Sequence, residues 1–201
     1  MAPSIEITPV CKRRFSAAFT LIELMITISV AAILVAVAAP SFQSLILNAR
    51  LSGKKNEFIY ALNFARSTAL AQNSSIVVCP YSAAGSTFCG ASWNSGWIIK
   101  KTDPSSGVAA LIKQYQSSAK DPVLSAVAYG GPAVTSITFD PVGLNTTQSN
   151  FTLCDSRSDA NAVSIQVLLT GLIQAGPPSP ATPPLPPAQR VAIWGGPLKC
   201  P

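Results

Sequence analysis

The residue with the clearest chemical potential is Glu23, a lone carboxylate inside an apolar run that extends from Phe19 to Ala39. An ionised carboxylate costs about 2.5–3.5 kcal/mol near the centre of a bilayer, and less near its edge. Such a group is therefore usually paired, and in a low-dielectric helix bundle a cation would attract it far more strongly than in water. The position of Glu23 predicts an ion-pairing role.

No catalytic constellation accompanies this carboxylate. The chain has no histidine, which removes the commonest general base and metal ligand and excludes Ser-His-Asp and Cys-His arrangements. It has no glycine-rich loop followed by Lys and Ser or Thr, as a phosphate cradle requires. The carboxylates beyond residue 72 stand beside Gly, Pro and Ser, as turn residues do: Asp103, Asp121, Asp140, Asp155 and Asp159. The sequence predicts a protein that is not an enzyme and that binds no cofactor or metal.

Three interpretations account for the first forty residues. Lys12, Arg13 and Arg14 precede the apolar run, as in a secretory signal peptide, and Ala36-Val37-Ala38 would suit its peptidase. A plain signal-anchor helix also fits an apolar run of about 20 residues with a cationic flank. Neither interpretation explains Glu23. Together, the cations and the run Phe19-Thr20-Leu21-Ile22-Glu23-Leu24 resemble the N-terminus of type IV pilins and type II secretion pseudopilins.

That resemblance implies cleavage by a prepilin peptidase between Ala18 and Phe19, followed by N-methylation of Phe19. It also implies that Glu23 meets the new terminal amine of a neighbouring subunit. In this chain Glu23 stands one helical turn after Phe19, at i+4. Residue 18 departs from the family, which nearly always carries Gly there, and the extra methyl group of Ala18 predicts slower cleavage.

Pro40 is expected to kink the helix rather than to end it, because membrane helices tolerate proline. After it, apolar residues follow the spacing of one helical face: Leu47, Leu51, Phe58, Leu62, Ala65 and Ala69. The charged residues are expected mostly elsewhere around the helix: Arg50, Lys54, Glu57 and Arg66. The sequence therefore predicts one helix from Phe19 to about Gln72, apolar all round at first and amphipathic later.

From Ser74 onward the pattern is that of a small β domain. Short apolar runs separated by Gly, Pro and Asp predict strands at residues 76–79, 96–100, 110–115, 123–129, 134–139, 151–154, 163–169 and 190–194. Turn residues at 103–107 predict a hairpin between the second and third. One long helix followed by many short strands predicts an α+β fold.

Four cysteines follow the apolar run, and Cys11 precedes it. An even number beyond a membrane segment favours an oxidising compartment and a disulfide framework. Three pairings are possible. Cys79 with Cys89 and Cys154 with Cys200 is favoured, because the second bond would fasten the C-terminal tail. A four-thiolate zinc site is disfavoured, because no C-x-x-C spacing occurs.

The globular part carries a second resemblance, to the GspH/FimT branch of minor pilins and pseudopilins. It rests on Cys79-Pro80, Cys89, Trp93, Gly96-Trp97-Ile98-Ile99, Phe139-Asp140-Pro141-Val142-Gly143 and Phe151-Thr152-Leu153-Cys154. The resemblance implies a type IV pilin-like fold, with one long N-terminal helix packed on a C-terminal antiparallel β domain. Trp93 and Trp97 are expected in the core rather than at a ligand site. Residues 176–187, rich in proline, are expected to form an exposed polyproline II loop.

The expected organisation is a leader at residues 1–18, a transmembrane and N-methylation segment at 19–40, the amphipathic half of the helix at 41–73, and the β domain at 74–201. The resemblance implies a single-pass inner-membrane protein with a periplasmic globular domain. It would become a minor subunit at or near the tip of a type IV pilus or a type II secretion pseudopilus. The implied partners are other pilin or pseudopilin subunits, prepilin peptidase, the inner-membrane assembly platform and membrane lipid.

Two alternative functions are a DNA-binding minor pilin in DNA uptake and a secreted binding domain with an ordinary signal peptide cut after Ala38. The formal net charge is +6, but beyond residue 72 seven cations accompany five anions, which is no electrostatic footprint for DNA. Some FimT-like members capture DNA with arginines after a Gly near the C-terminus. The corresponding Gly171-Leu172-Ile173-Gln174 carries no Arg, so DNA is disfavoured as a partner.

Overall fold

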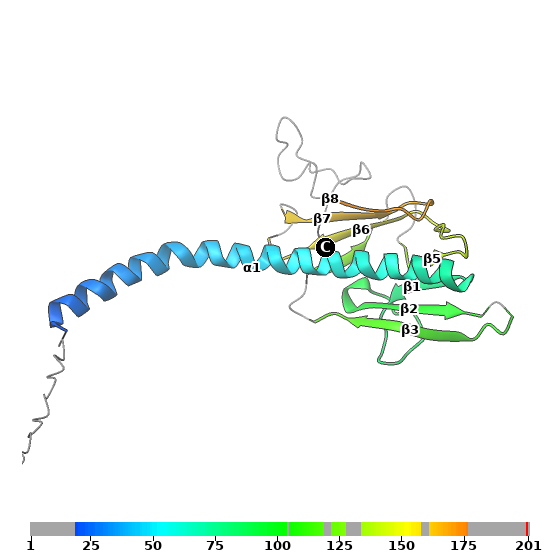
Figure 1. Ribbon diagram of the computed structural model, residues 1–201, viewed down its shortest axis with the longest axis horizontal. Helices are drawn as coiled ribbons and strands as arrows, with labels where there is room; N and C mark the ends of the chain where they lie inside the picture. Colours follow the sequence, from blue (N-terminus) through cyan, green and yellow to red (C-terminus); the bar gives the residue numbers. More distant parts are fainter. Residues whose placement is uncertain are drawn as a thin grey trace, which may run out of the picture. The chain divides into compact units, whose positions relative to one another are not determined.

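A single long helix, α1, runs from Leu21 to Gln72 in the computed structural model (Figure 1). The hydroxyl oxygen of Thr20 accepts a hydrogen bond from the Glu23 amide at 3.3 Å, as N-cap residues do. Asn73 ends the helix in the left-handed conformation, with φ 46°. Its amide and the next one donate hydrogen bonds to two carbonyls of the last turn, which is a Schellman motif. Local sequence therefore sets both ends of α1.

The structure describes residues 19–103, 105–118, 122–127, 134–157, 161–176 and 200, without the side chains of residues 39 and 40. The chain divides into two units, Met1–Ser44 and Leu45–Pro201. In the first unit, α1 continues through position 40 and each described residue is exposed. The side chain of Pro40 is not among the described ones, so the expected kink at this residue stays a prediction.

In the second unit, α1 packs against two four-stranded antiparallel sheets, which lie on either side of it in Figure 1. The strand orders are β3-β2-β1-β5 and β4-β6-β7-β8. The elements after α1 are β1 Ile76–Pro80, η1 Trp93–Ser95 (a 3-10 helix), β2 Gly96–Thr102, β3 Ala109–Gln116, β4 Val123–Ala126, β5 Ile137–Phe139, β6 Ser149–Cys154, β7 Val163–Val167 and β8 Ile173–Gly176. One long helix followed by antiparallel strands confirms the expected α+β architecture.

The strands agree with the sequence in most places. β1, β2, β3, β6 and β7 lie within two residues of their expected bounds, and β2 and β3 form the predicted hairpin. β5 begins only at Ile137, where its pairing with β1 starts. The carbonyl of Val134 lies outside this strand and accepts a hydrogen bond from Trp93 Nε1. β8 was not expected. The strand at 190–194 and nearly all of the proline-rich segment lie outside the described residues.

Phe58 joins α1 to both sheets. Its ring contacts Trp97 on β2 and Phe151 on β6 edge to face, with centroids 4.9 and 5.1 Å apart. It also meets Trp93 at 5.9 Å. Both tryptophans are buried, which confirms their expected place in the core. The predicted helical face is confirmed as well, with Leu51, Phe58, Leu62, Ala65 and Ala69 buried and Leu47 half-buried.

The expectation that Lys54 lies away from this face is wrong. Its side chain is only 5% exposed and forms an ion pair of 3.1 Å with Glu57. The ammonium also lies 4.6 Å from the centroid of the Trp97 ring. Position 54 is three residues after Leu51 and four before Phe58, so helical spacing places it on the buried face. The aliphatic stem and the cation–π contact make burial of this cation acceptable.

Gly171 stands in the turn between β7 and β8 with φ 74°. An added Cβ would lie 2.1 Å from the Gly143 carbonyl oxygen, whereas Gly107, with φ 68°, has nothing within 4 Å. We therefore expect Gly171→Ala to lower the free energy of unfolding by about 3 kcal/mol or more, and the matched Gly107→Ala by about 1 kcal/mol. Denaturant unfolding of both variants measures the difference. Equal losses of unfolding free energy would mean that the backbone near Gly143 moves away from the added methyl group without cost.

Candidate assembly site

The first turn of α1 presents an acid beside the predicted new N-terminus. Phe19 is 74% exposed, and Glu23 is exposed in the first turn. Within the described part of the chain, the Glu23 amide has a partner in Thr20, but no hydrogen bond or ion pair involves its carboxylate. The carboxylate is therefore available to a group from another molecule.

Thr20 and Glu23 also offer a purely local explanation for this acid. The pattern Thr-x-x-Glu is that of a capping box, in which the Glu side chain reaches back to the N-cap amide. The structure forms one half of the box, the bond from the Glu23 amide to Thr20 Oγ1. The return bond from the carboxylate does not occur among the described residues. Capping thus accounts for Thr20 more fully than for Glu23.

The helix that carries Glu23 is apolar and uncovered. An 18-residue window of α1 has mean hydropathy 2.6 and is 0% buried, so within the described residues one helix is long and apolar enough to cross a membrane. Soluble core helices pass the same test of length and composition, but they are mostly buried. Signal sequences pass it too. The large exposed side chains, Leu21, Ile22, Ile33, Leu34 and Val37 among them, need lipid or protein to cover them.

The other predicted site residues fall into two groups. Ala18 lies outside the described residues. All four candidate cysteines are described. Cys79 is bonded to Cys89, with Cα atoms 5.5 Å apart, and Cys154 is bonded to Cys200, with Cα atoms 5.8 Å apart. This is the pairing that the sequence favours. The second bond joins the end of β6 to the penultimate residue.

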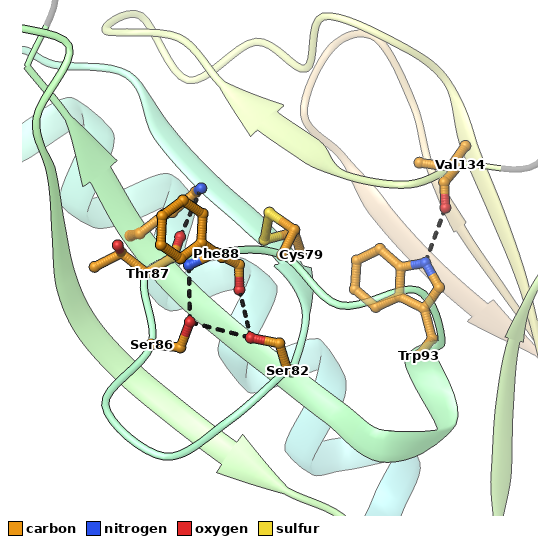
Figure 2. The surroundings of a disulfide bond; sticks show 9 residues. Cys79, Ser82, Ser86, Thr87, Phe88, Trp93 and Val134 are labelled. Carbon is orange, nitrogen blue, oxygen red and sulfur yellow. Dashed lines mark hydrogen bonds between the residues drawn. A yellow bond between two sulfur atoms is a disulfide. The ribbon is translucent and has the colours of Figure 1, made fainter.

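The bond between Cys79 and Cys89 closes a loop that side chains hold in place (Figure 2). Ser82 Oγ donates to the Phe88 carbonyl at 2.8 Å, and the Phe88 amide donates to Ser86 Oγ at 3.1 Å. Lys100 on β2 donates to the Thr87 carbonyl at 2.8 Å. The loop therefore lies against β2.

Three cations of the β domain that could otherwise contact DNA are engaged within the domain. Lys100 binds the loop carbonyl, and Lys101 Nζ lies 3.4 Å from Gln72 Oε1. Arg157 Nε donates to the Asp155 carboxylate at 3.0 Å. Burial alone would raise the pKa of Asp155, but the hydrogen bonds from Arg157 outweigh it and lower this pKa below its ordinary value. Arg190 and Lys199 lie outside the described residues, and the described residues contain no group that could hold a metal.

Two protein-family models match this chain, and together they cover the apolar helix and most of the β domain. The model of the type II transport protein GspH matches residues 55–171, which is more than half of the chain. The chain belongs to the GspH family. A second model, the prokaryotic N-terminal methylation motif, matches residues 13–39 of this GspH-family chain. The two matches make the protein a subunit of the minor pilin or pseudopilin type. Subunits of this type are structural, so the protein is not an enzyme.

Similar solved structures include two of the type IV minor pilin FimU from Pseudomonas aeruginosa strain PAO1. One is 22% identical, covers 63% of this chain and 88% of its own, and has a TM-score of 0.49. The other is 23% identical, covers 61% and 89%, and has a TM-score of 0.44. No curated protein sequence matches this GspH-family chain.

Proposed function

We propose that this GspH-family protein is a minor subunit of a type IV pilus or a type II secretion pseudopilus. One observation carries the proposal: the match to the methylation motif lies on a helix whose apolar window is 0% buried. A surface of that kind requires lipid before assembly and neighbouring helices after it. Membership of an assembling family supports other pilin-like subunits as its partners.

The proposed mechanism begins with processing. Prepilin peptidase removes residues 1–18, including Lys12, Arg13 and Arg14, and leaves an amine at Phe19 that is then methylated. Before assembly the helix spans the inner membrane, with the β domain in the periplasm. Two features support this orientation: the cationic flank, which favours the cytoplasm, and the two disulfides, which favour an oxidising compartment.

The proposed assembly step is an ion pair between subunits. The Glu23 carboxylate of one subunit receives the Phe19 amine of its neighbour, delivered by the assembly platform. Between apolar helices the attraction is far stronger than in water, and each pair would fix the axial register of two subunits. The support in this chain is the exposed carboxylate, which lies beside the predicted cut.

The mature N-terminus tests the proposal directly. We expect mass spectrometry of the membrane-extracted chain to find Phe19, methylated, as the first residue. Ala18→Gly should accelerate processing severalfold, because it removes the methyl group next to the scissile bond, whereas Ala17→Gly should not. A chain that begins at Met1 or at Ala39 would contradict the proposal, and Ala39 would instead indicate an ordinary secretory signal.

A further inference from the structure

An exposed apolar surface lies on three segments near the C-terminal end of α1. We call it the loop patch. It consists of Leu70, Val142, Leu144, Leu169 and Leu172, which are 50%, 67%, 46%, 54% and 48% exposed. Contiguous apolar surfaces on soluble domains commonly mark interaction sites. The core packing described above uses none of these side chains.

Hydrogen bonds hold the three segments together. Arg66 Nε on α1 donates to the Gly143 carbonyl at 3.0 Å, and its Nη2 donates to the Thr170 carbonyl at 3.2 Å. The Asn145 amide donates to the Leu169 carbonyl at 2.9 Å. A Cβ added at Gly171 would lie 2.1 Å from the Gly143 carbonyl oxygen, and one added at Gly143 would lie 3.2 Å from the Leu70 side chain. The loop patch is thus a preorganised surface, which lowers the entropic cost of binding.

The loop patch is also poor in free charge. Residues 66–70, 140–145 and 168–172 contain two charged groups, Arg66 and Asp140. Arg66 is bonded to backbone carbonyls, and Asp140 Oδ1 accepts from the Val142 and Leu144 amides at 3.0 and 2.8 Å. Nucleic acid and anionic headgroups are recognised through free cations. This surface instead fits an apolar surface of another protein.

The size of the loop patch indicates what kind of protein contact it can make. Five half-exposed aliphatic side chains present roughly 400 Å², about half of what each partner buries in a stable complex. An open hollow of about 540 Å³, lined by Tyr60, Phe64 and Ser67 among others, shares Leu70 with it. The combined surface suits a contact that is weak alone and strengthened when a second attachment brings the partners together.

We propose that the loop patch binds the globular domain of a neighbouring subunit in the same fibre. This proposal rests on the proposed function, because the N-terminal helices supply the second attachment. The patch lies near the end of α1, at residues 66–70, whereas the helix enters this unit at Leu45. Within this unit the loop patch therefore lies at the end of α1 opposite to Leu45.

The experiment compares two variants of the full-length chain in its own host, one with two substitutions and one with a single substitution. Val142→Ser/Leu169→Ser makes the loop patch polar. Val108→Ser is the matched control, because Val108 is 66% exposed and Val142 is 67% exposed, but Val108 lies in the β2–β3 hairpin. We expect the patch variant to enter sheared fibres at least about fivefold less than wild type at equal membrane levels, and the control to be unchanged.

The outcomes separate this proposal from the function on which it rests. Wild-type protein absent from fibres would contradict both. Wild-type protein present, with the patch variant incorporated equally, would overturn the loop patch alone. A photo-reactive p-benzoylphenylalanine at position 172 identifies the occupant. An adduct with another pilin-like subunit supports the proposal, and an adduct only with an exported protein or lipid overturns it.

Discussion

Replacing Glu23 with glutamine should leave the chain in the membrane at its normal level and reduce its incorporation into fibres by about tenfold or more. The substitution removes the charge that would attract the neighbour's Phe19 amine. It also makes the apolar segment cheaper to insert, so a loss of insertion is not expected. Quantitative immunoblots of membranes and of sheared fibres measure the two quantities separately.

Glutamine separates the ion pair from helix capping better than alanine does, because a capping box accepts Gln in place of Glu. If Glu23 served the helix end alone, Glu23→Gln would assemble normally and Glu23→Ala would not. Thr20→Ala provides the complementary control. It removes the hydrogen bond from the Glu23 amide, costs about 0.5–2 kcal/mol of helix stability, and keeps the carboxylate. Normal assembly of Glu23→Gln would refute the ion-pair mechanism.

Much of the fold follows from patterns that are local in the chain. Helical spacing after residue 47 identifies the face that packs on the sheets, and turn residues at 103–107 identify the β2–β3 hairpin. Asn73 adds a helix stop that sequence inspection can find, because Asn tolerates the left-handed conformation. These features are predictable because each depends on residues within a few positions of one another.

Lys54 shows where residue type misleads. Its charge suggests solvent, while its position, three residues after Leu51, is that of a core residue. What permits burial is Trp97, a residue distant in sequence whose ring lies under the ammonium. The helical spacing of Lys54 predicts its burial, whereas its charge predicts exposure. The partner could not be predicted, because it depends on how α1 meets β2.

β8 and the loop patch could not be predicted for a similar reason. Residues 173–176 show no alternation of buried and exposed side chains, and the strand exists because its backbone pairs with β7. The residues of the loop patch lie far apart in the chain, and Arg66 brings them together through bonds to two loops. Only the folded arrangement shows that these aliphatic side chains share one surface.

Replacing Phe58 with alanine should have the largest effect on stability. The ring is 0% exposed and makes edge-to-face contacts with Trp93, Trp97 and Phe151. Truncation of a buried Phe to Ala costs about 3–5 kcal/mol, out of a typical total of about 5–15 kcal/mol. Thermal unfolding of the detergent-solubilised chain measures the loss. Tyr60→Ala, on the same helix but 56% exposed, should cost less than about 1 kcal/mol.

The consequences of Phe58→Ala in cells should differ from those of Glu23→Gln. Since Phe58 joins α1 to both sheets, its loss increases the unfolded fraction of the β domain, which proteases remove. We expect less full-length protein in the membrane, and a proportional decrease in fibres. Glu23→Gln should change the ratio of fibre to membrane protein instead. If Phe58→Ala is as stable as Tyr60→Ala, other contacts hold the helix to the sheets. If Phe58→Ala instead changes the ratio of fibre to membrane protein at a normal membrane level, Phe58 acts in assembly rather than in the core.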